Sequence, residues 1–339
     1  MTDHGSNKAL VLKFYDALDS ARPGEVARVM NRFTASDYQF RGVHPFNELK
    51  GSDAVASVLW EPLHHSFRHL QRRPDIFMAG TSEIDGTAWT CSMGHLLGLF
   101  DQDWLGIPAT RKMAFLRYSD FSRIVAGRIV ETGFFCDIIG VMKQAGISPL
   151  PLQTGAELLV PGPRTHDGLL LQPQPERETA TTIALVNQMK DDLVGSDEGF
   201  GCSDYVLART WHDDMIWFGP SGIGSTFTIR RYQLQHQDPF RNGLRDVTFN
   251  GHVSRFAEGH YAGWFGWPNL TMTPAGGFLG LPATNLRVNM RVVDIYRRDG
   301  DKLSENWVFI DLLYWLLQQG VDLLNRTREI VSGPVIQGR

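Results

Sequence analysis

Apolar residues at helical spacing open each half of the chain. The recurring positions are Leu10, Phe14, Tyr15 and Leu18 in the first half and Ile183, Val186, Met189 and Leu193 in the second. Residues at such spacing line one face of a helix, so both segments are predicted to be helical. A further helix is expected to begin at Ser52 and another at Ser225, because serine before an apolar run is an N-cap signal.

Patterns typical of strands follow the helices. RVNMRVVDIY from Arg287 alternates polar and apolar residues, as one face of a half-buried strand would. LSENWVFID from Leu303 comes after the turn RRDGDK, which completes a hairpin. Helices followed by consecutive antiparallel strands predict an α+β fold and not a doubly wound parallel sheet.

Almost the same hexapeptide occurs twice, as LGIPAT from Leu105 and LGLPAT from Leu279, 174 positions apart (279 − 105). With this offset held, residues 105–147 fall on residues 279–321, and 13 of the 43 pairs are identical. Unrelated sequence of ordinary composition would give about two or three identities. We therefore infer an internal duplication.

Proline is concentrated between the two copies. It occurs at positions 149, 151, 161, 163, 173 and 175, which forbids a long helix or a central strand there. The predicted organisation is a first domain over residues 1–150, a Pro-rich linker over 151–175 and a second domain over 176–339.

Composition narrows the class of protein. The 339 residues are 42% hydrophobic and 21% charged, which is ordinary for a soluble globular protein. A net charge of −4 gives no reason to expect nucleic acid as a partner. Cys91, Cys136 and Cys202 are odd in number without paired spacing, which favours a reducing, cytoplasmic location over a disulfide framework. The first residues are polar, so no signal peptide is predicted. The longest apolar stretch, WVFIDLLYWLL, is short, so no membrane span is predicted.

The last strand of each copy carries acids among aromatic residues. Side chains in a strand alternate faces, so Glu305, Trp307, Phe309 and Asp311 share one face, and Glu131, Gly133, Phe135 and Asp137 share it in the first copy. Buried charges are costly unless paired, protonated or used, and desolvation can bring a carboxyl pKa near neutral pH. Asp137 and Asp311 are therefore candidate general acid/bases. The candidates for contacting substrate are Glu131, Phe135, Glu305, Trp307, Phe309, Trp89 and Trp267.

Structural roles would explain the same acids. Asp137 and Asp311 directly precede apolar helical runs, so each is equally suited to be a helix N-cap. The glutamates could pair with an arginine on a neighbouring strand, and Arg117 and Arg291 recur in register to supply one. The two acids of one strand are six residues apart, or about 20 Å, which excludes a glycosidase-like dyad.

A polar side chain recurs in the strand before the hexapeptide. His95 lies in the apolar run WTCSMGHLLGLF, and its counterpart at the same offset is Asn269 in GWFGWPNLTM. Both can donate a hydrogen bond to a carbonyl or enolate oxygen, although a satisfied core residue is the simpler explanation of a lone histidine. His65 and His69 form an i, i+4 pair, but the sequence offers no third ligand, so we predict no metal site.

The order G-H-x-x-G, L-G-I-P-A-T, a strand ending in aspartate and an apolar helix closing in Q-x-G resembles the SnoaL-like polyketide cyclases. These belong to the nuclear transport factor two (NTF2) superfamily, whose members fold as a cone of curved antiparallel sheet capped by helices. The resemblance covers most of both halves and is strongest over residues 94–147 and 268–321. It implies two tandem cone-shaped α+β barrels.

The resemblance also implies chemistry. It implies a general acid/base at Asp137 and Asp311, and a polar pocket residue at His95 and, as a substitution, at Asn269. The implied reaction is a cofactor-free intramolecular aldol cyclisation, or a related isomerisation, of a small carbonyl-containing molecule. The sequence departs from the family pattern at Gly133, where the second copy has Trp307.

Alternatives from other classes remain open, because proteins with this cone include isomerases, dehydratases and pure binding proteins, and fold does not settle reaction. One alternative is a noncatalytic small-molecule-binding or scaffold protein, and another is a hydrolase or dehydratase that uses the same aspartate with water. The expected partner is an apolar or polycyclic small molecule. Paired cones often associate through their sheets, so the tandem chain is expected to imitate a dimer within one molecule, and further homo-oligomers are compatible with this.

Overall fold

The computed structural model describes residues 4–195 and 201–333. The helices of the first half are α1 (His4–Asp19), α2 (Val26–Phe33), α3 (Ser52–Val55), the π-helical η1 (Ala56–Trp60), α4 (Glu61–Ser66) and α5 (Ile138–Gln144). Its strands are β1 (Thr34–Gly42), β2 (Asn47–Lys50), β3 (Phe67–Thr81), β4 (Ala88–Phe100), β5 (Met113–Val125) and β6 (Arg128–Cys136). The helix predicted at Ser52 begins at that residue, but its N-cap is Gly51 and no side chain caps it.

The second half repeats this order. Its helices are α6 (Glu176–Val194), α7 (Asp204–Leu207), α8 (Ile229–Tyr232), η2 (Gln233–Gln237), α9 (Asp238–Gly243), η3 (Phe278–Gly280), α10 (Leu312–Leu317) and α11 (Leu323–Ser332). Its strands are β7 (Trp211–Phe218), β8 (Thr226–Phe227), β9 (Leu244–Phe249), β10 (Ser254–Glu258), β11 (Tyr261–Pro274), β12 (Val288–Asp299) and β13 (Lys302–Ile310). The helix expected at Ser225 instead begins at Ile229, with the Thr228 side chain as its cap.

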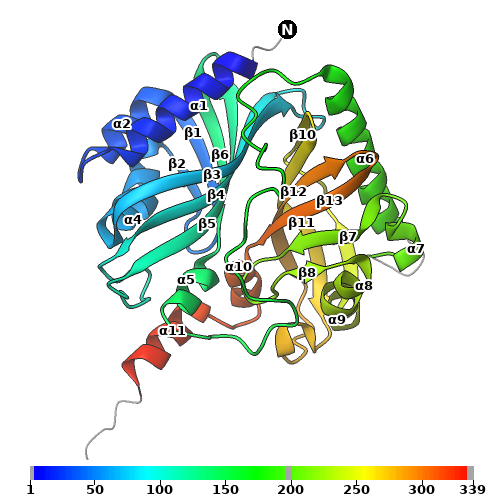
Figure 1. Ribbon diagram of the computed structural model, residues 1–339. Coiled ribbons are helices and arrows are strands. Elements are labelled where there is room, and N and C mark those ends of the chain that lie inside the picture. Colours follow the sequence, from blue (N-terminus) through cyan, green and yellow to red (C-terminus); the bar gives the residue numbers. More distant parts are fainter. Residues whose placement is uncertain (1–3, 196–200, 334–339) are drawn as a thin grey trace, which may run out of the picture.

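Each half is built on one curved sheet, and the fold is α+β (Figure 1). The first sheet has the order β2-β1-β6-β5-β4-β3, and the second has the order β10-β11-β12-β13-β7-β8, with β9 paired to β11. Neighbouring strands are antiparallel except β1 with β6 and β7 with β13, which are parallel. Helices α1 and α6 lie along their respective sheets, so each sheet has a helix-covered interior face.

The duplication is visible in local conformation. Leu105 and Leu279 both have positive φ, at 54° and 56°, although left-handed backbone is unfavourable for leucine. Gln144 exchanges two hydrogen bonds with the backbone of Phe115, and Gln318 does the same with Asn289, one offset of 174 away. The repeated residues therefore hold the same turn and the same helix-to-strand contact in both halves.

The two sheets pack against each other through their outer faces, the faces turned away from the helices. Phe265 of β11 contacts the rings of Trp89, Phe121 and Phe135 from the first sheet. A Cβ atom on Gly133 would lie 2.9 Å from the Phe265 ring, so glycine at this position makes room for it. The tandem chain thus forms a dimer-like pair within one molecule.

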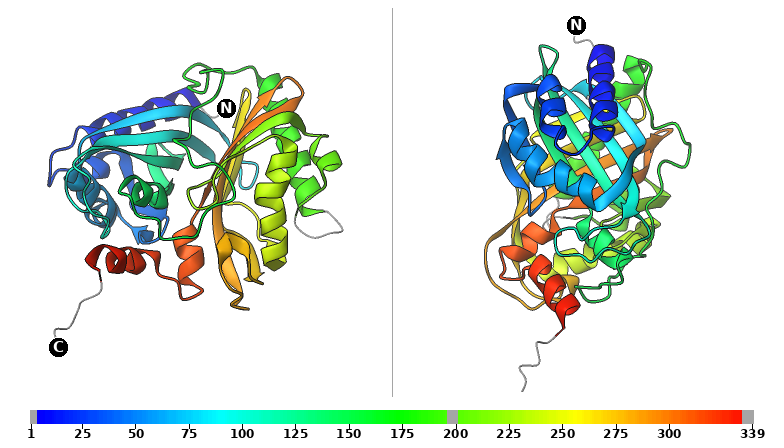
Figure 2. Two further views of the ribbon diagram at one scale, coloured as in Figure 1. Left: turned by 60° about the horizontal axis from the view of Figure 1, so that its bottom comes forward. Right: turned by 90° about the vertical axis from the view of Figure 1, so that its left-hand side faces the viewer.

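The Pro-rich segment runs along the seam between the halves (Figure 2). Ala156 bridges to Ser225, the Pro161 carbonyl accepts a hydrogen bond from Trp307, and Leu169 bridges to Phe77. The C-terminal helix α11 returns to the first half, where the Thr327 hydroxyl contacts the Met142 sulfur. Both connections stabilise the arrangement of the two sheets.

Cys91, Cys136 and Cys202 are buried and form no disulfide. Within residues 4–195 and 201–333, none of the helices has the length and apolar character that crossing a membrane would require.

Candidate functional site

The interior of the second half encloses a cavity of about 100 Å³ between its sheet, α6 and the helices around η2. Its sheet wall is formed by alternate residues of β12 and β13, which are Met290, Val292, Asp294, Tyr296, Asn306, Val308 and Ile310. The aromatic residues Trp211, Trp217, Trp264 and Phe240 complete much of the lining. This face of β13 is the one opposite to the face that carries Glu305, Trp307 and Phe309.

Asp294 is the acid of this cavity. Its Oδ1 accepts hydrogen bonds from the Tyr296 hydroxyl at 3.0 Å and the Asn306 amide at 3.3 Å, and its Oδ2 accepts one from Trp264 Nε1 at 3.0 Å. Burial nevertheless raises the pKa of Asp294 from 3.8 to about 6, because the surroundings penalise its charged form more than the three donors favour it. The side chain is therefore oriented rigidly and titrates close to neutral pH.

Several polar atoms of the cavity wall have no partner. Among the described residues, none offers a hydrogen bond to Asn269 Oδ1, Gln237 Oε1, His236 Nδ1 or His252 Nδ1. His236 stacks on Trp217 with ring centroids 3.9 Å apart, and His252 stacks on Trp264 at 4.5 Å. Burial lowers the pKa of both imidazoles to about 3, so both are neutral. Buried polar groups normally have partners, and these four atoms are therefore available to a ligand or to water.

An arginine occupies the corresponding interior of the first half. Asp120, the counterpart of Asp294 at the offset of 174, lies near Arg72, whose guanidinium packs over Tyr15 at 4.1 Å and Tyr118 at 5.0 Å. Arg72 also forms an ion pair with Asp19. The two interiors have thus diverged, one plugged by an arginine and the other hollow.

The structure places Asp137 and Asp311 at helix N-termini, the structural role that the sequence left open. Asp137 accepts hydrogen bonds from Gly140 N at 2.9 Å and from Ser221 N, in the other half, at 2.8 Å. Asp311 accepts from Tyr314 N at 3.1 Å and from His44 N, again in the other half, at 3.0 Å. Each aspartate therefore caps its own helix and ties down a loop of the opposite half, and their catalytic role stays a prediction.

The glutamates are in ion pairs, but the suggested partners were wrong. Glu131 pairs with Arg41 and Arg123, and Glu305 pairs with Arg297. Arg123 and Arg297 are themselves related by the offset of 174. Arg291 instead pairs with Asp311, at 3.2 Å, and Arg117 donates to the carbonyls of Phe218 and Gly219.

The aromatic residues predicted to contact substrate lie between the two sheets or along the linker. Trp89 and Phe135 pack on Phe265, and Phe135 also meets Trp267 edge to face. In the second half, Trp307 stacks on Phe218, and Phe309 lies under the Arg117 guanidinium. The structure therefore gathers them in the seam and not around the cavity of the second half.

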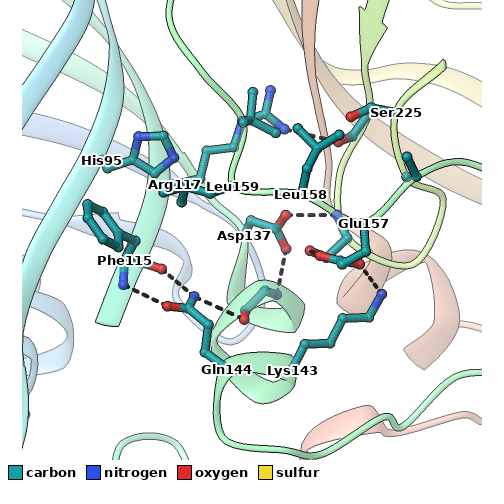
Figure 3. A pocket seen from close by; sticks show the side chains of 16 residues that line it. His95, Phe115, Arg117, Asp137, Lys143, Gln144, Glu157, Leu158, Leu159 and Ser225 are labelled. Carbon is teal, nitrogen blue, oxygen red and sulfur yellow. Dashed lines mark hydrogen bonds and ion pairs between the residues drawn. The ribbon is translucent and has the colours of Figure 1, made fainter. Parts of the chain in front are cut away.

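His95 and Asn269 lie in different places despite their common offset. Asn269 lines the cavity that holds Asp294. His95 lines a second pocket, of about 340 Å³, between the first sheet, the linker and the loop after β7 (Figure 3). Asp137 also lines this second pocket, so the structure brings together one predicted pair there. No cluster of three or more metal-ligating side chains occurs among residues 4–195 and 201–333.

Sequence reasoning missed Asp294, although two signals for it were present. Asp120 and Asp294 are an identical pair in the duplication, and Asp294 stands on one face of its strand with Met290, Val292 and Tyr296. An acid on an otherwise apolar strand face is unusual. Asp137 and Asp311 are also an identical pair in the duplication, so the repeat alone did not distinguish Asp294 from them.

Comparisons with known proteins find likeness at the level of structure. No family model matches the chain, and no curated protein sequence matches it. A protein assigned to the SnoaL-like polyketide cyclases from Jannaschia sp. CCS1 is 18% identical and has a TM-score of 0.35, with 44% of this chain and 100% of that chain covered. An NTF2-like protein from Burkholderia xenovorans LB400 is 14% identical over 42% of this chain and 97% of its own, with a TM-score of 0.33. A protein assigned to the polyketide cyclases from Xanthomonas campestris pv. campestris is 18% identical over 42% of this chain and 99% of its own, with a TM-score of 0.35.

Proposed function

We propose that the second half is a cofactor-free acid/base enzyme that acts on a small carbonyl compound, with Asp294 as the group that moves the proton. The observation that carries this proposal is a carboxyl with a pKa near 6, fixed by three donors in a cavity with unpartnered polar atoms. A general acid/base works best when its pKa lies near the operating pH. Burial also raises the pKa of Asp311 to about 6, but that carboxyl is paired with Arg291 and accepts hydrogen bonds from His44 N and Tyr314 N. We assign the role to Asp294 because it lines a cavity that also offers unpartnered polar atoms.

The chemistry follows from the groups on the cavity wall. The Asp294 carboxylate removes a proton from a carbon flanked by carbonyl groups, and the electron pair is delocalised onto a carbonyl oxygen as an enolate. The amide of Asn269 supplies a hydrogen bond to that oxygen, since the assignment of its oxygen and nitrogen positions is interchangeable. The enolate carbon then attacks a second carbonyl carbon, and the new alkoxide takes the proton back from Asp294. Proton return to a different carbon would instead give an isomerisation.

The size of the cavity bears on the substrate. Pockets for drug-sized ligands usually measure about 300–1,000 Å³, and this cavity measures about 100 Å³. A compact substrate therefore fits better than the flat polycyclic one that the aromatic content predicted. Its walls of tryptophan and aliphatic side chains favour an uncharged molecule.

The test is deuterium exchange at the acidic carbon of small β-keto esters such as methyl acetoacetate, followed by NMR in D₂O. We expect the protein to accelerate exchange, and Asp294→Asn to lower the catalysed rate by about 10²–10⁴-fold. Asp120→Asn, the matched change in the plugged half, is expected to keep the rate. The proposal fails if Asp294→Asn retains full activity or if the protein accelerates no exchange. Saturable binding without exchange would favour the noncatalytic binding protein.

A further inference from the structure

The pocket between the two halves holds a buried cation without an acidic partner. Arg117 is only 4% exposed, and its two terminal nitrogens donate to the carbonyls of Phe218 and Gly219, each at 3.1 Å. Its Nε has no partner, and no described carboxylate lies within ion-pair distance of its guanidinium. Asp137 and Asp75 attract Arg117 without forming an ion pair with it, and the Phe309 ring packs on its guanidinium at 4.2 Å. A buried charge without a direct ionic partner is costly, and a negatively charged ligand would offset that cost.

A second unpartnered nitrogen lies beside it. His95 on β4 is directly opposite Arg117 on β5 in the antiparallel pair, and the imidazole is 7% exposed. Its Nδ1 is 3.6 Å from the Asp75 carboxylate, while its Nε2 has no partner among the described residues. Facing residues on neighbouring antiparallel strands have Cα atoms about 4.5–5.5 Å apart. Both side chains therefore stand on the same face of the sheet, and both line this pocket.

The acids that line the same pocket are already engaged. Asp137 accepts from the backbone of Gly140 and Ser221. Glu157 forms an ion pair with Lys143 and accepts a hydrogen bond from the Ser221 hydroxyl, as Figure 3 shows in part. Arg117 is therefore a cation of the pocket that has no direct ionic partner, and the nearby Asp137 carboxylate is held by backbone N–H groups.

The rest of the wall is suited to an apolar group. Leu158 and Leu159 of the linker line the pocket and are 40% and 58% exposed, so they offer apolar surface to a ligand. Phe115 forms a further part of the wall and meets the His95 ring edge to face at 5.7 Å. The volume of about 340 Å³ lies within the usual range for small-molecule sites.

We propose that this pocket is a second binding site, separate from the cavity of Asp294, for a small organic acid with an apolar or aromatic tail. The carboxylate pairs with Arg117 and accepts a hydrogen bond from His95, and the tail covers Leu158, Leu159 and Phe115. The site exists only in the tandem chain, since its walls come from the first sheet, the linker and the loop after β7. In the second half, the counterpart Arg291 is closed off between Trp267 and Tyr314 and paired with Asp311.

The test is calorimetric titration of the full chain with phenylacetate and with its uncharged analogue phenylacetamide. We expect saturable binding of the acid and at least about tenfold weaker binding of the amide, because the charge-assisted contact is lost. Arg117→Gln is expected to weaken binding of the acid. Because that change could disturb the seam, Leu159→Glu provides a second variant that alters an exposed side chain and places a repelling charge at the pocket.

Two controls locate the site. Leu152→Glu adds the same charge at a fully exposed linker position that does not line the pocket, and it is expected to keep the affinity. Asp294→Asn is also expected to keep it, so failure of this proposal is distinguishable from failure of the proposed enzymatic function. The proposal is overturned if acid and amide bind equally, if Leu159→Glu keeps the affinity, if Asp294→Asn abolishes binding, or if phenylacetate shows no saturable binding.

Discussion

Replacing Asp294 with asparagine should change how stability depends on pH. The substitution keeps the shape of the side chain and removes its ionisation. In the folded protein the pKa of Asp294 is about 6, against 3.8 for the unperturbed group. The contribution of this aspartate to stability is therefore fully present below pH 3.8 and is lost as the pH rises through about 6.

The size of the effect follows from the pKa difference. At 1.36 kcal/mol per pKa unit, the move from 3.8 to about 6 corresponds to about 3 kcal/mol. The asparagine variant does not carry this cost of ionisation. The difference in unfolding free energy, variant minus wild type, should therefore rise by about 2.5 kcal/mol between pH 4 and pH 8, because a small part of the change already occurs below pH 4. Any loss of hydrogen bonding to Trp264, Tyr296 or Asn306 adds a term that does not depend on pH.

The measurement is urea unfolding of both proteins at a series of pH values, with intrinsic tryptophan fluorescence as the signal. Asp213→Asn, which removes an exposed carboxylate from β7, serves as the control and should change the free energy little at any pH. Carbon-13 NMR of the aspartate carboxyls gives the pKa of Asp294 directly. A difference between variant and wild type that stays constant across the pH range would refute the reasoning, as would a pKa near 4.

Further predictions concern the seam between the halves. Asp311→Ala should destabilise the protein by about 3–5 kcal/mol in chemical unfolding, because it leaves Arg291 buried without its partner; a loss below 1 kcal/mol would contradict the pairing. Asp137→Ala, which removes a helix cap with no direct ion pair, should cost only about 0.5–2 kcal/mol in the same assay. Gly133→Ala should lower stability by about 1–3 kcal/mol through contact with Phe265, and the double variant with Phe265→Leu should recover part of the loss; an unchanged single variant would argue against close packing there.

The fold was largely accessible from sequence because its signals are periodic and occur twice. The two hexapeptides aligned the first half with the second at an offset of 174. The alternation over residues 287–296 identified β12 correctly. The parallel pairing of β1 with β6 had no such signal, since strand neighbours that are distant in sequence leave no local pattern. The prolines predicted that no long helix or central strand lies between the copies, but the course of this segment along the seam depends on contacts such as Ala156 with Ser225 that only the folded chain makes.

The site was harder to predict because alternation reveals two faces of a strand but not which face looks inward. On β13, the face that carries Glu305, Trp307 and Phe309 was the one that suggested a catalytic site. In the structure, this face packs against the other sheet. The inward face, with Asn306, Val308 and Ile310, looked ordinary. Apolar residues on both faces are expected where a strand is covered on both sides, and here the second cover is the other half of the same chain.

The contact of Phe265 with Gly133 across the seam is not repeated at the equivalent positions of the two halves. Gly133 receives the Phe265 ring, whereas the equivalent position in the second half is Trp307. Two copies of the second half, joined by the same rotation, would bring the phenylalanine of one onto the tryptophan of the other. In a tandem chain, the residues on the two sides of this contact can be substituted separately. In a dimer of identical subunits, one substitution changes both subunits. A pair built from two copies of either half would therefore lack the fit of Phe265 onto Gly133 that joins the two halves here.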